Sequence, residues 1–167
     1  MIRYREVNIN SPEILRVFIS GCSSAGKTYF AKRLIDVIRP NRVYYFHPDF
    51  HETSPVDWNA IYQAGVPSLE DLLEIPEFSC IVLDDLYHEC KDSKTIDYLF
   101  RVLSTKRKLH VIIMTQRYFS NGVYALNIRN SCNYHVLMRN ADEHANSRAA
   151  RTMKLSKEFK LAESFTS

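Results

Sequence analysis

Short apolar runs alternate along this chain with longer segments in which apolar residues recur every three or four positions. The runs are rich in β-branched and aromatic residues, which is typical of buried strands, and the longer segments have helical spacing. The expected strands are 14–20, 42–46, 78–83, 109–115 and 134–138, and the expected helices are 27–38, 68–75, 93–106 and 141–154 or beyond. This alternation predicts an α/β fold with a mainly parallel sheet and helices on both faces.

The ends of several predicted helices carry specific signals. Ser68 precedes the helix 68–75 and has Asp71 three positions later, a near match to a capping box. Ser93 stands at the start of the helix 93–106, whose basic end suits the helix dipole. These signals support the helix boundaries.

Length and composition indicate one intracellular globular domain. The chain has 167 residues, of which 46% are hydrophobic and 25% are charged. No apolar run approaches the ~18 residues that span a bilayer. The polar start of the chain is unlike a signal peptide, so we expect no membrane contact. The four cysteines lack metal-ligand spacing and are expected to be free thiols. We divide the chain into an N-terminal extension (1–13), a domain (14–155) and a C-terminal helix end and tail (156–167).

The net charge of +3 hides an asymmetry between the two parts of the chain. Residues 1–100 carry 10 Lys and Arg against 15 Asp and Glu, whereas residues 101–167 carry 12 against 4. Solvated helix faces explain such a basic region in the simplest way. An anionic polymer such as nucleic acid, contacted by Lys106–Lys108 and the C-terminal basic residues, is the alternative.

A phosphate-binding loop follows the first predicted strand directly. Residues 21–28 match G-x-x-x-x-G-K-[ST] in full, between a strand and a helix. The backbone N–H groups of residues 22–27 are expected to surround a phosphate at the helix N-terminus. Lys27 is expected to reach the β- and γ-phosphates of a nucleotide and Thr28 to bind Mg²⁺. The predicted binding residues are Gly21, Cys22, Ser23, Ser24, Ala25, Gly26, Lys27 and Thr28.

Two carboxylates end the predicted strand 78–83 in the sequence IVLDDL, which is a Walker-B pattern. Asp84 is expected to hold Mg²⁺ through water, and Asp85 to orient or deprotonate an attacking water. The 56 residues between Lys27 and Asp84 leave room for an inserted strand, for which RVYYF (42–46) is the candidate. This layout resembles the additional-strand, catalytic-acid division of P-loop ATPases.

Gln116 follows the predicted strand 109–115. A polar residue at this place can contact both the γ-phosphate and the attacking water, so we interpret Gln116 as a sensor. The chain contains no N-K-x-D guanine motif, which argues against a small GTPase.

Taken together, these motifs and the segment 115–153 resemble the viral genome-packaging ATPases of the FtsK-HerA superfamily, of the poxvirus and Polinton/adintovirus types. The resemblance covers roughly residues 14–153. It implies that Gln116 is the sensor, that Tyr118, Phe119 and Gly122 belong to its loop, and that Arg129 matches the arginine of the loop before the last strand.

The resemblance also implies an activity and partners. It implies ATP and Mg²⁺ as cofactors, double-stranded DNA as the translocated partner, and a homo-oligomeric ring in which an arginine completes the neighbouring site. Arg129 is the first candidate for that arginine, with Arg117 and Arg148 as further ones. Capsid portal or vertex proteins, and the host nucleus or cytoplasm, follow if the protein is viral. A cellular or mobile-element translocase and a small-molecule kinase remain alternatives.

Overall fold

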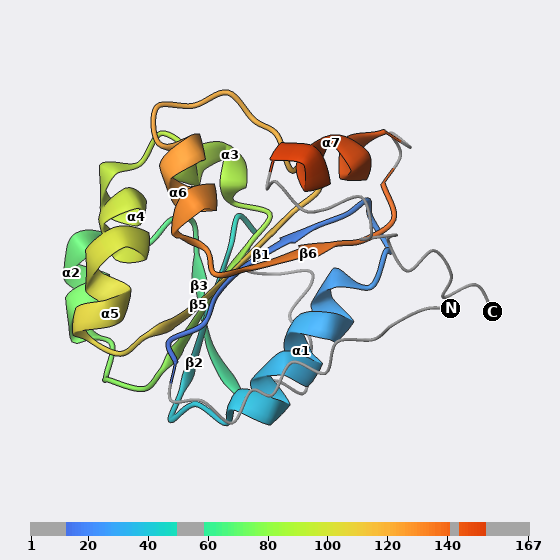
Figure 1. The fold of residues 1–167 in the computed structure, drawn as a ribbon. Coiled ribbons are helices and arrows are strands. Elements are labelled where there is room, and N and C mark those ends of the chain that lie inside the picture. The colour runs from blue at the N-terminus through green and yellow to red at the C-terminus, as the bar shows by residue number, and fades with distance from the viewer. Residues whose placement is uncertain (1–12, 50–58, 141–143, 153–167) are drawn as a thin grey trace.

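Six parallel strands form one sheet, with the order β3-β2-β4-β5-β1-β6 (Figure 1). The computed structural model describes residues 13–49, 59–140 and 144–152. Each strand is four to six residues long, as short buried strands usually are. The strands are β1 (Arg16–Ser20), β2 (Val43–His47), β3 (Ala60–Ala64), β4 (Cys80–Asp84), β5 (His110–Thr115) and β6 (Tyr134–Leu137).

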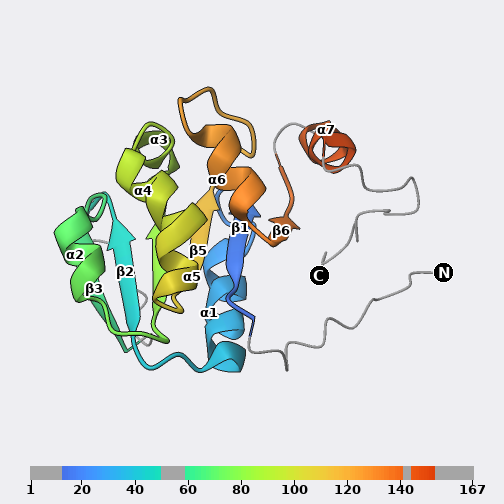
Figure 2. The ribbon, with the colours of Figure 1, turned by 60° about the vertical axis from the view of Figure 1, so that its left-hand side comes forward.

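Helices cover both faces of this sheet, as Figures 1 and 2 show. The longest helix packs on one face, and most of the others pack on the opposite face. The helices are α1 (Lys27–Ile38), α2 (Leu69–Glu74), α3 (Tyr87–Cys90), α4 (Lys94–Tyr98), a π-helix (Leu99–Leu103), α5 (Ser104–Lys106), α6 (Ala125–Ser131) and α7 (Ala145–Thr152). The predicted α/β fold class is confirmed.

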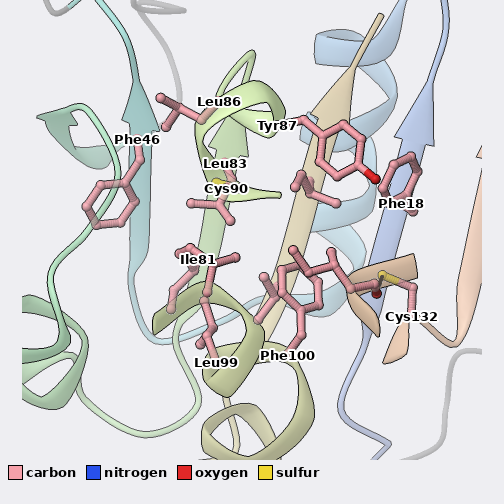
Figure 3. Packing of buried hydrophobic residues seen from close by; sticks show 14 of the residues in the cluster. Phe18, Phe46, Ile81, Leu83, Leu86, Tyr87, Cys90, Leu99, Phe100 and Cys132 are labelled. Atoms are coloured by element: carbon pink, nitrogen blue, oxygen red, sulfur yellow. Dashed lines mark hydrogen bonds between the residues drawn. The ribbon is translucent and has the colours of Figure 1, made fainter. Parts of the chain in front are cut away.

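Alternate residues of the central strands build two separate cores. Val82 and Ile112 belong to the cluster beneath α1, which contributes Ala31 and Ile35. Ile81 and Val111, one residue earlier on each strand, belong to the cluster beneath α2–α6. Figure 3 shows part of that second cluster, in which Phe18 of β1 meets Tyr87 of α3. Burial on both faces explains why these strands read as continuous apolar runs.

The strand predicted at 42–46 is confirmed, but it does not lie between β1 and β4 in the sheet. The segment 42–46 corresponds to β2, which lies between β3 and β4. The strand inserted between β1 and β4 is β5, which follows the two carboxylates in sequence. A strand's place in a parallel sheet depends on where its preceding helix crosses over, and chain order alone does not determine it.

The expected helix caps are confirmed. The Ser68 side chain accepts from the backbone N–H of Asp71, whose own side chain accepts from the backbone N–H of Ser68, which completes a capping box. The Ser93 side chain accepts from the N–H of Ile96 at 3.3 Å. The segment 94–106 is helical throughout, with a π-helical turn in its middle.

Several expectations fall outside the described residues. The N-terminal extension up to residue 12, the loop with Trp58 and the tail 156–167 are among them. Within the described ranges, no helix is both long and apolar enough to cross a bilayer. The four cysteines are free, as predicted, and burial raises the pKa of the Cys80 and Cys90 thiols to about 12.

Candidate functional site

The register of the sheet brings the predicted motifs to one edge. Ser20 pairs with Thr115 between β1 and β5, and Asp84 pairs with Met114 between β4 and β5. The loop that follows Ser20, the carboxylates at the end of β4 and Gln116 therefore meet at the carboxyl ends of the strands. This edge is where open α/β sheets bind their ligands.

The two glycines of the loop 21–28 are needed for different reasons. A Cβ on Gly21 would lie 2.8 Å from the Cβ of Met138, so this position must be glycine to let the segment after β6 pack against the loop. Gly26 has open space around it but a φ of +93°, a backbone conformation that favours glycine. Gly21 thus fixes the packing of the loop, and Gly26 fixes its entry into α1.

The backbone amides of this loop fall into two groups. The Cys22 N–H donates to the carbonyl of Arg139 at 2.9 Å, and the Ala25 N–H donates to the carbonyl of Cys22 at 3.2 Å. These two amides form hydrogen bonds within the protein. Fewer amides of residues 22–27 than predicted are therefore available as donors to a phosphate. Among the described residues, four amides of that range have no protein acceptor, and they belong to Ser23, Ser24, Gly26 and Lys27. Such a group of N–H donors at a helix N-terminus suits a phosphate.

Lys27, the first residue of α1, lies over the loop. Its Nζ donates to the carbonyls of Gly21 at 2.8 Å and Cys22 at 2.9 Å. An ammonium group has three protons, so one is free in this arrangement, and a bound triphosphate can displace the two carbonyls to accept the others. Thr28 follows on α1 with an exposed side chain, so its hydroxyl can reach a ligand held by the loop. Both residues stand where the motif predicts them.

Asp84, the last residue of β4, has the same strand parity as Val82 and so faces the side of the sheet that α1 covers. The hydroxyl of the buried Tyr45 donates to its carboxylate Oδ2. Burial raises the pKa of the Asp84 carboxyl, while the Tyr45 hydrogen bond and the charges of His47 and Lys27 act in the opposite direction. Asp84 is therefore a carboxylate with a fixed orientation, which suits a cation ligand.

Replacing Tyr45 by phenylalanine is expected to raise, several-fold, the Mg²⁺ concentration needed for half-maximal nucleotide turnover. The change removes a hydrogen bond to a charged group, a contact usually worth about 1.5–3 kcal/mol, and frees the Asp84 carboxylate to rotate. A Mg²⁺ titration of turnover measures the effect. Tyr44→Phe on the opposite face of β2 is the matched control. An equal Mg²⁺ requirement in both variants would contradict a role for Tyr45.

Asp85 and Gln116 face one pocket of about 500 Å³. Asp85 is exposed and leaves the strand with a φ of +54°, and its N–H donates to the carbonyl of Met114 at 3.2 Å. This turn separates the Asp85 side chain from that of Asp84. The pocket is lined by α3 on one side and by the segment after β5 on the other, through Asp85, Tyr87, His88, Lys91, Thr115, Gln116, Arg117, Phe119, Ser120 and Asn121. A carboxylate and an amide in one pocket can together bind a water molecule.

The segment after Gln116 is held by the end of α3. Lys91 donates from Nζ to the carbonyl of Asn121 at 2.6 Å, and its own carbonyl accepts from the N–H of Tyr124 at 2.8 Å. Asp92 accepts from the N–H of Val123 at 2.8 Å. Residues 91–92 thus connect the acidic edge to the predicted sensor loop, and no sequence motif marks them.

Arg129 lies on α6 and not in a loop before the last strand, which corrects the expectation. Its Nη1 donates to the Tyr87 hydroxyl at 3.1 Å, and its guanidinium carbon is 5.6 Å and 5.5 Å from the ring centroids of Tyr118 and Phe119. The other two candidates, Arg117 and Arg148, are exposed, and Arg117 lines the pocket.

The basic run Lys106–Lys108 lies at the opposite edge of the sheet, just before β5. The Arg107 guanidinium donates to the carbonyls of Leu73 at 3.0 Å and Ile75 at 2.8 Å, and so caps the end of α2. The Lys108 ammonium lies 5.0 Å from the centroid of the Phe78 ring. Two of the three charges therefore have a structural contact within the protein.

This sheet, its phosphate-binding loop and its acidic edge define an α/β fold of the P-loop NTPase kind. Solved structures share the fold. The genome packaging NTPase B204 from Sulfolobus turreted icosahedral virus 2, in complex with ATP-gammaS, matches 87% of this chain and 84% of its own with a TM-score of 0.58 and 14% identity. Its complex with AMPPCP gives a TM-score of 0.56 at 15% identity, over 86% and 88% of the two chains.

The cytoplasmic domain of EssC is also similar, with a TM-score of 0.54 and 15% identity. The match covers 80% of this chain and 33% of the EssC chain. No protein-family model matches the sequence, and no curated protein does. At these identities the likeness establishes the fold.

Proposed function

We propose that this chain is an FtsK-HerA-type ATPase that hydrolyses ATP to ADP and phosphate with Mg²⁺. The observation that carries the proposal is the meeting of the phosphate loop, the two carboxylates and Gln116 at one edge of the sheet. The likeness to an NTPase whose structures hold ATP-gammaS and AMPPCP supports it.

The residues present fit a magnesium nucleotide. Four amide donors, together with Lys27, oppose the negative charge of a triphosphate. Thr28 and Asp84 supply the oxygen ligands that Mg²⁺ prefers, and the Asp84 carboxylate is already oriented by Tyr45. Bound Mg²⁺ would neutralise charge on the phosphate oxygens.

The two carboxylates have different roles, with Asp84 as the Mg²⁺ ligand and Asp85 as the proton acceptor. Asp85 accepts a proton from a water molecule as the water oxygen forms a bond to the γ-phosphorus. The bond from that phosphorus to the β–γ bridging oxygen breaks, and the electron pair stays with ADP. Gln116 donates its amide N–H to the γ-phosphate and accepts from the water, so it couples the state of the nucleotide to the loop that follows it.

The finer proposal is a DNA translocase that packages viral double-stranded DNA into a capsid. The likeness to B204, a genome packaging NTPase, supports it, as does the basic charge of residues 101–167. The enzyme would work as a homo-oligomeric ring at a capsid portal or vertex protein, in the nucleus or cytoplasm of a host cell. Since the Arg129 guanidinium is engaged within its own chain, we propose Arg117 for the arginine that reaches a neighbouring site.

DNA-stimulated hydrolysis tests this function. Phosphate release from Mg-ATP is measured with and without duplex DNA, at two salt concentrations. We expect several-fold stimulation that decreases as salt rises, because DNA contacts displace counterions. A parallel reaction offers nucleosides and small metabolites as acceptors. Transfer of the γ-phosphate to an acceptor, without DNA stimulation, would refute the motor and identify a small-molecule kinase.

A further inference from the structure

Arg129 is a charged residue that sits among aromatic groups behind the pocket of Asp85 and Gln116. Its side chain is half-buried. Within the described residues, no carboxylate lies within ion-pair distance of its guanidinium. Because burying a charge is costly unless the charge is well bonded, the contacts that hold this group are informative.

One set of contacts leads to the acidic edge. Arg129 donates to the Tyr87 hydroxyl at 3.1 Å, and Tyr87 begins α3 two residues after Asp85. Tyr87 is buried, and its ring packs edge-on against Phe18 of β1 with the centroids 5.2 Å apart (Figure 3). Arg129 is therefore bonded to a buried residue on the same short segment as Asp85.

The other set of contacts leads to the predicted sensor. The same Nη1 lies 3.4 Å from the carbonyl of Tyr118, and the guanidinium lies over the rings of Tyr118 and Phe119. Tyr118, two residues after Gln116, is buried and packs edge-on against Phe18 at 5.3 Å. Arg129 and Phe18 thus each contact Tyr87 and Tyr118. Through these two residues they contact both the Asp85 segment and the Gln116 segment.

We infer that Arg129 is a positioning residue that couples the Asp85 segment to the Gln116 segment inside one subunit. Tyr87 and Phe119 both contact its guanidinium and both line the pocket, so Arg129 acts through the pocket wall without touching the bound nucleotide. A guanidinium suits this role because it remains charged, offers several donors and stacks on aromatic rings. The inference rests on the proposed hydrolytic function, in which Asp85 and Gln116 must bind the same water.

Steady-state kinetics of ATP hydrolysis tests the coupling. Arg129→Met is expected to lower kcat about tenfold, with an unchanged KM for ATP, because the P-loop and Lys27 keep their contacts. Tyr87→Phe removes only the hydroxyl and is expected to lower kcat less. The double variant should be no slower than Arg129→Met alone. Arg42→Met, an exposed arginine before β2, is the matched control. A double variant whose loss of kcat equals the product of the two single losses would contradict the coupling.

Mixed subunits separate this role from an arginine that serves a neighbour. Arg129→Met protein is mixed with Lys27→Ala protein, each of which is expected to have low activity alone. If Arg129 acts within its own subunit, the mixture shows no recovery of hydrolysis. Recovery above the sum of the two proteins would overturn the inference and would leave the ATPase function intact.

Amide hydrogen exchange without nucleotide provides a readout that does not depend on activity. In Arg129→Met, both segments 84–92 and 115–124 are expected to exchange faster than in the wild-type protein, whereas Arg42→Met leaves them unchanged. Unchanged exchange in both segments would refute the positioning role. A wild-type protein that hydrolyses no ATP would refute the proposed function, and the exchange measurement would still decide the role of Arg129.

Discussion

Replacing Lys27 by alanine is expected to reduce ATP turnover by about 10²- to 10⁴-fold, because the change removes charge-assisted hydrogen bonds to two phosphate groups, each worth about 1.5–3 kcal/mol. The fold should survive, since within the described residues the Nζ donates hydrogen bonds only to the carbonyls of Gly21 and Cys22. Phosphate release at saturating Mg-ATP measures the turnover, and thermal unfolding measures the fold.

The matched control for this variant is Lys94→Ala. Lys94 is an exposed lysine at the start of α4, which packs on the face of the sheet opposite to α1. The Lys94→Ala variant should hydrolyse ATP at the wild-type rate. Wild-type turnover in Lys27→Ala would show that the loop 21–28 is not the site of hydrolysis, whatever nucleotide the protein binds elsewhere.

Replacing Asp85 by asparagine is expected to lower kcat by about 10²- to 10⁴-fold while nucleotide binding is retained. Asparagine keeps the shape of the side chain and tolerates the φ of +54° at this position, but its amide does not accept a proton from water. Binding of a fluorescent ATP analogue and phosphate release, measured on the same preparation, separate the two steps.

Asp36→Asn on the exposed surface of α1 controls for the loss of one negative charge. If Asp85→Asn retained full kcat, the proton acceptor would have to be another group. If the variant lost nucleotide binding as well, Asp85 would be holding the ligand, and the division of roles between the two carboxylates would be wrong.

The elements with marked ends could be predicted from the sequence. The helix 27–38 has the observed bounds, because the phosphate loop fixes its start and Arg39-Pro40 fixes its end. The phosphate loop and the carboxylates of Asp84 and Asp85 were recognisable because each follows an apolar strand. Their meeting at one edge then follows from parallel pairing.

Elements without such marks were missed. Among the described strands, β3 lies at the edge and pairs only with β2, and it is partly exposed, so its apolar pattern is weak. α3 has only four residues, and α6 carries polar residues among its few apolar ones. Because α6 was not foreseen, Arg129 was expected in a loop.

Long-range contacts within the site had no signal in the sequence. Tyr45 and Asp84 are 39 positions apart, and their hydrogen bond depends on β2 lying beside β4. The same holds for Arg129 and Tyr87, which are 42 positions apart. Pairs of this kind are set by tertiary packing, which local patterns do not encode.

The most direct test of the central claim, that one edge of the sheet forms a magnesium-ATP site, is an experimental structure with ATP-gammaS and Mg²⁺. We expect the triphosphate on the loop 21–28, with the Lys27 Nζ about 2.7–2.9 Å from its oxygens. The Asp84 carboxylate should face the bound Mg²⁺. Asp85 and Gln116 should face the γ-phosphate. A nucleotide bound elsewhere, or one whose γ-phosphate points away from Asp85 and Gln116, would contradict the account.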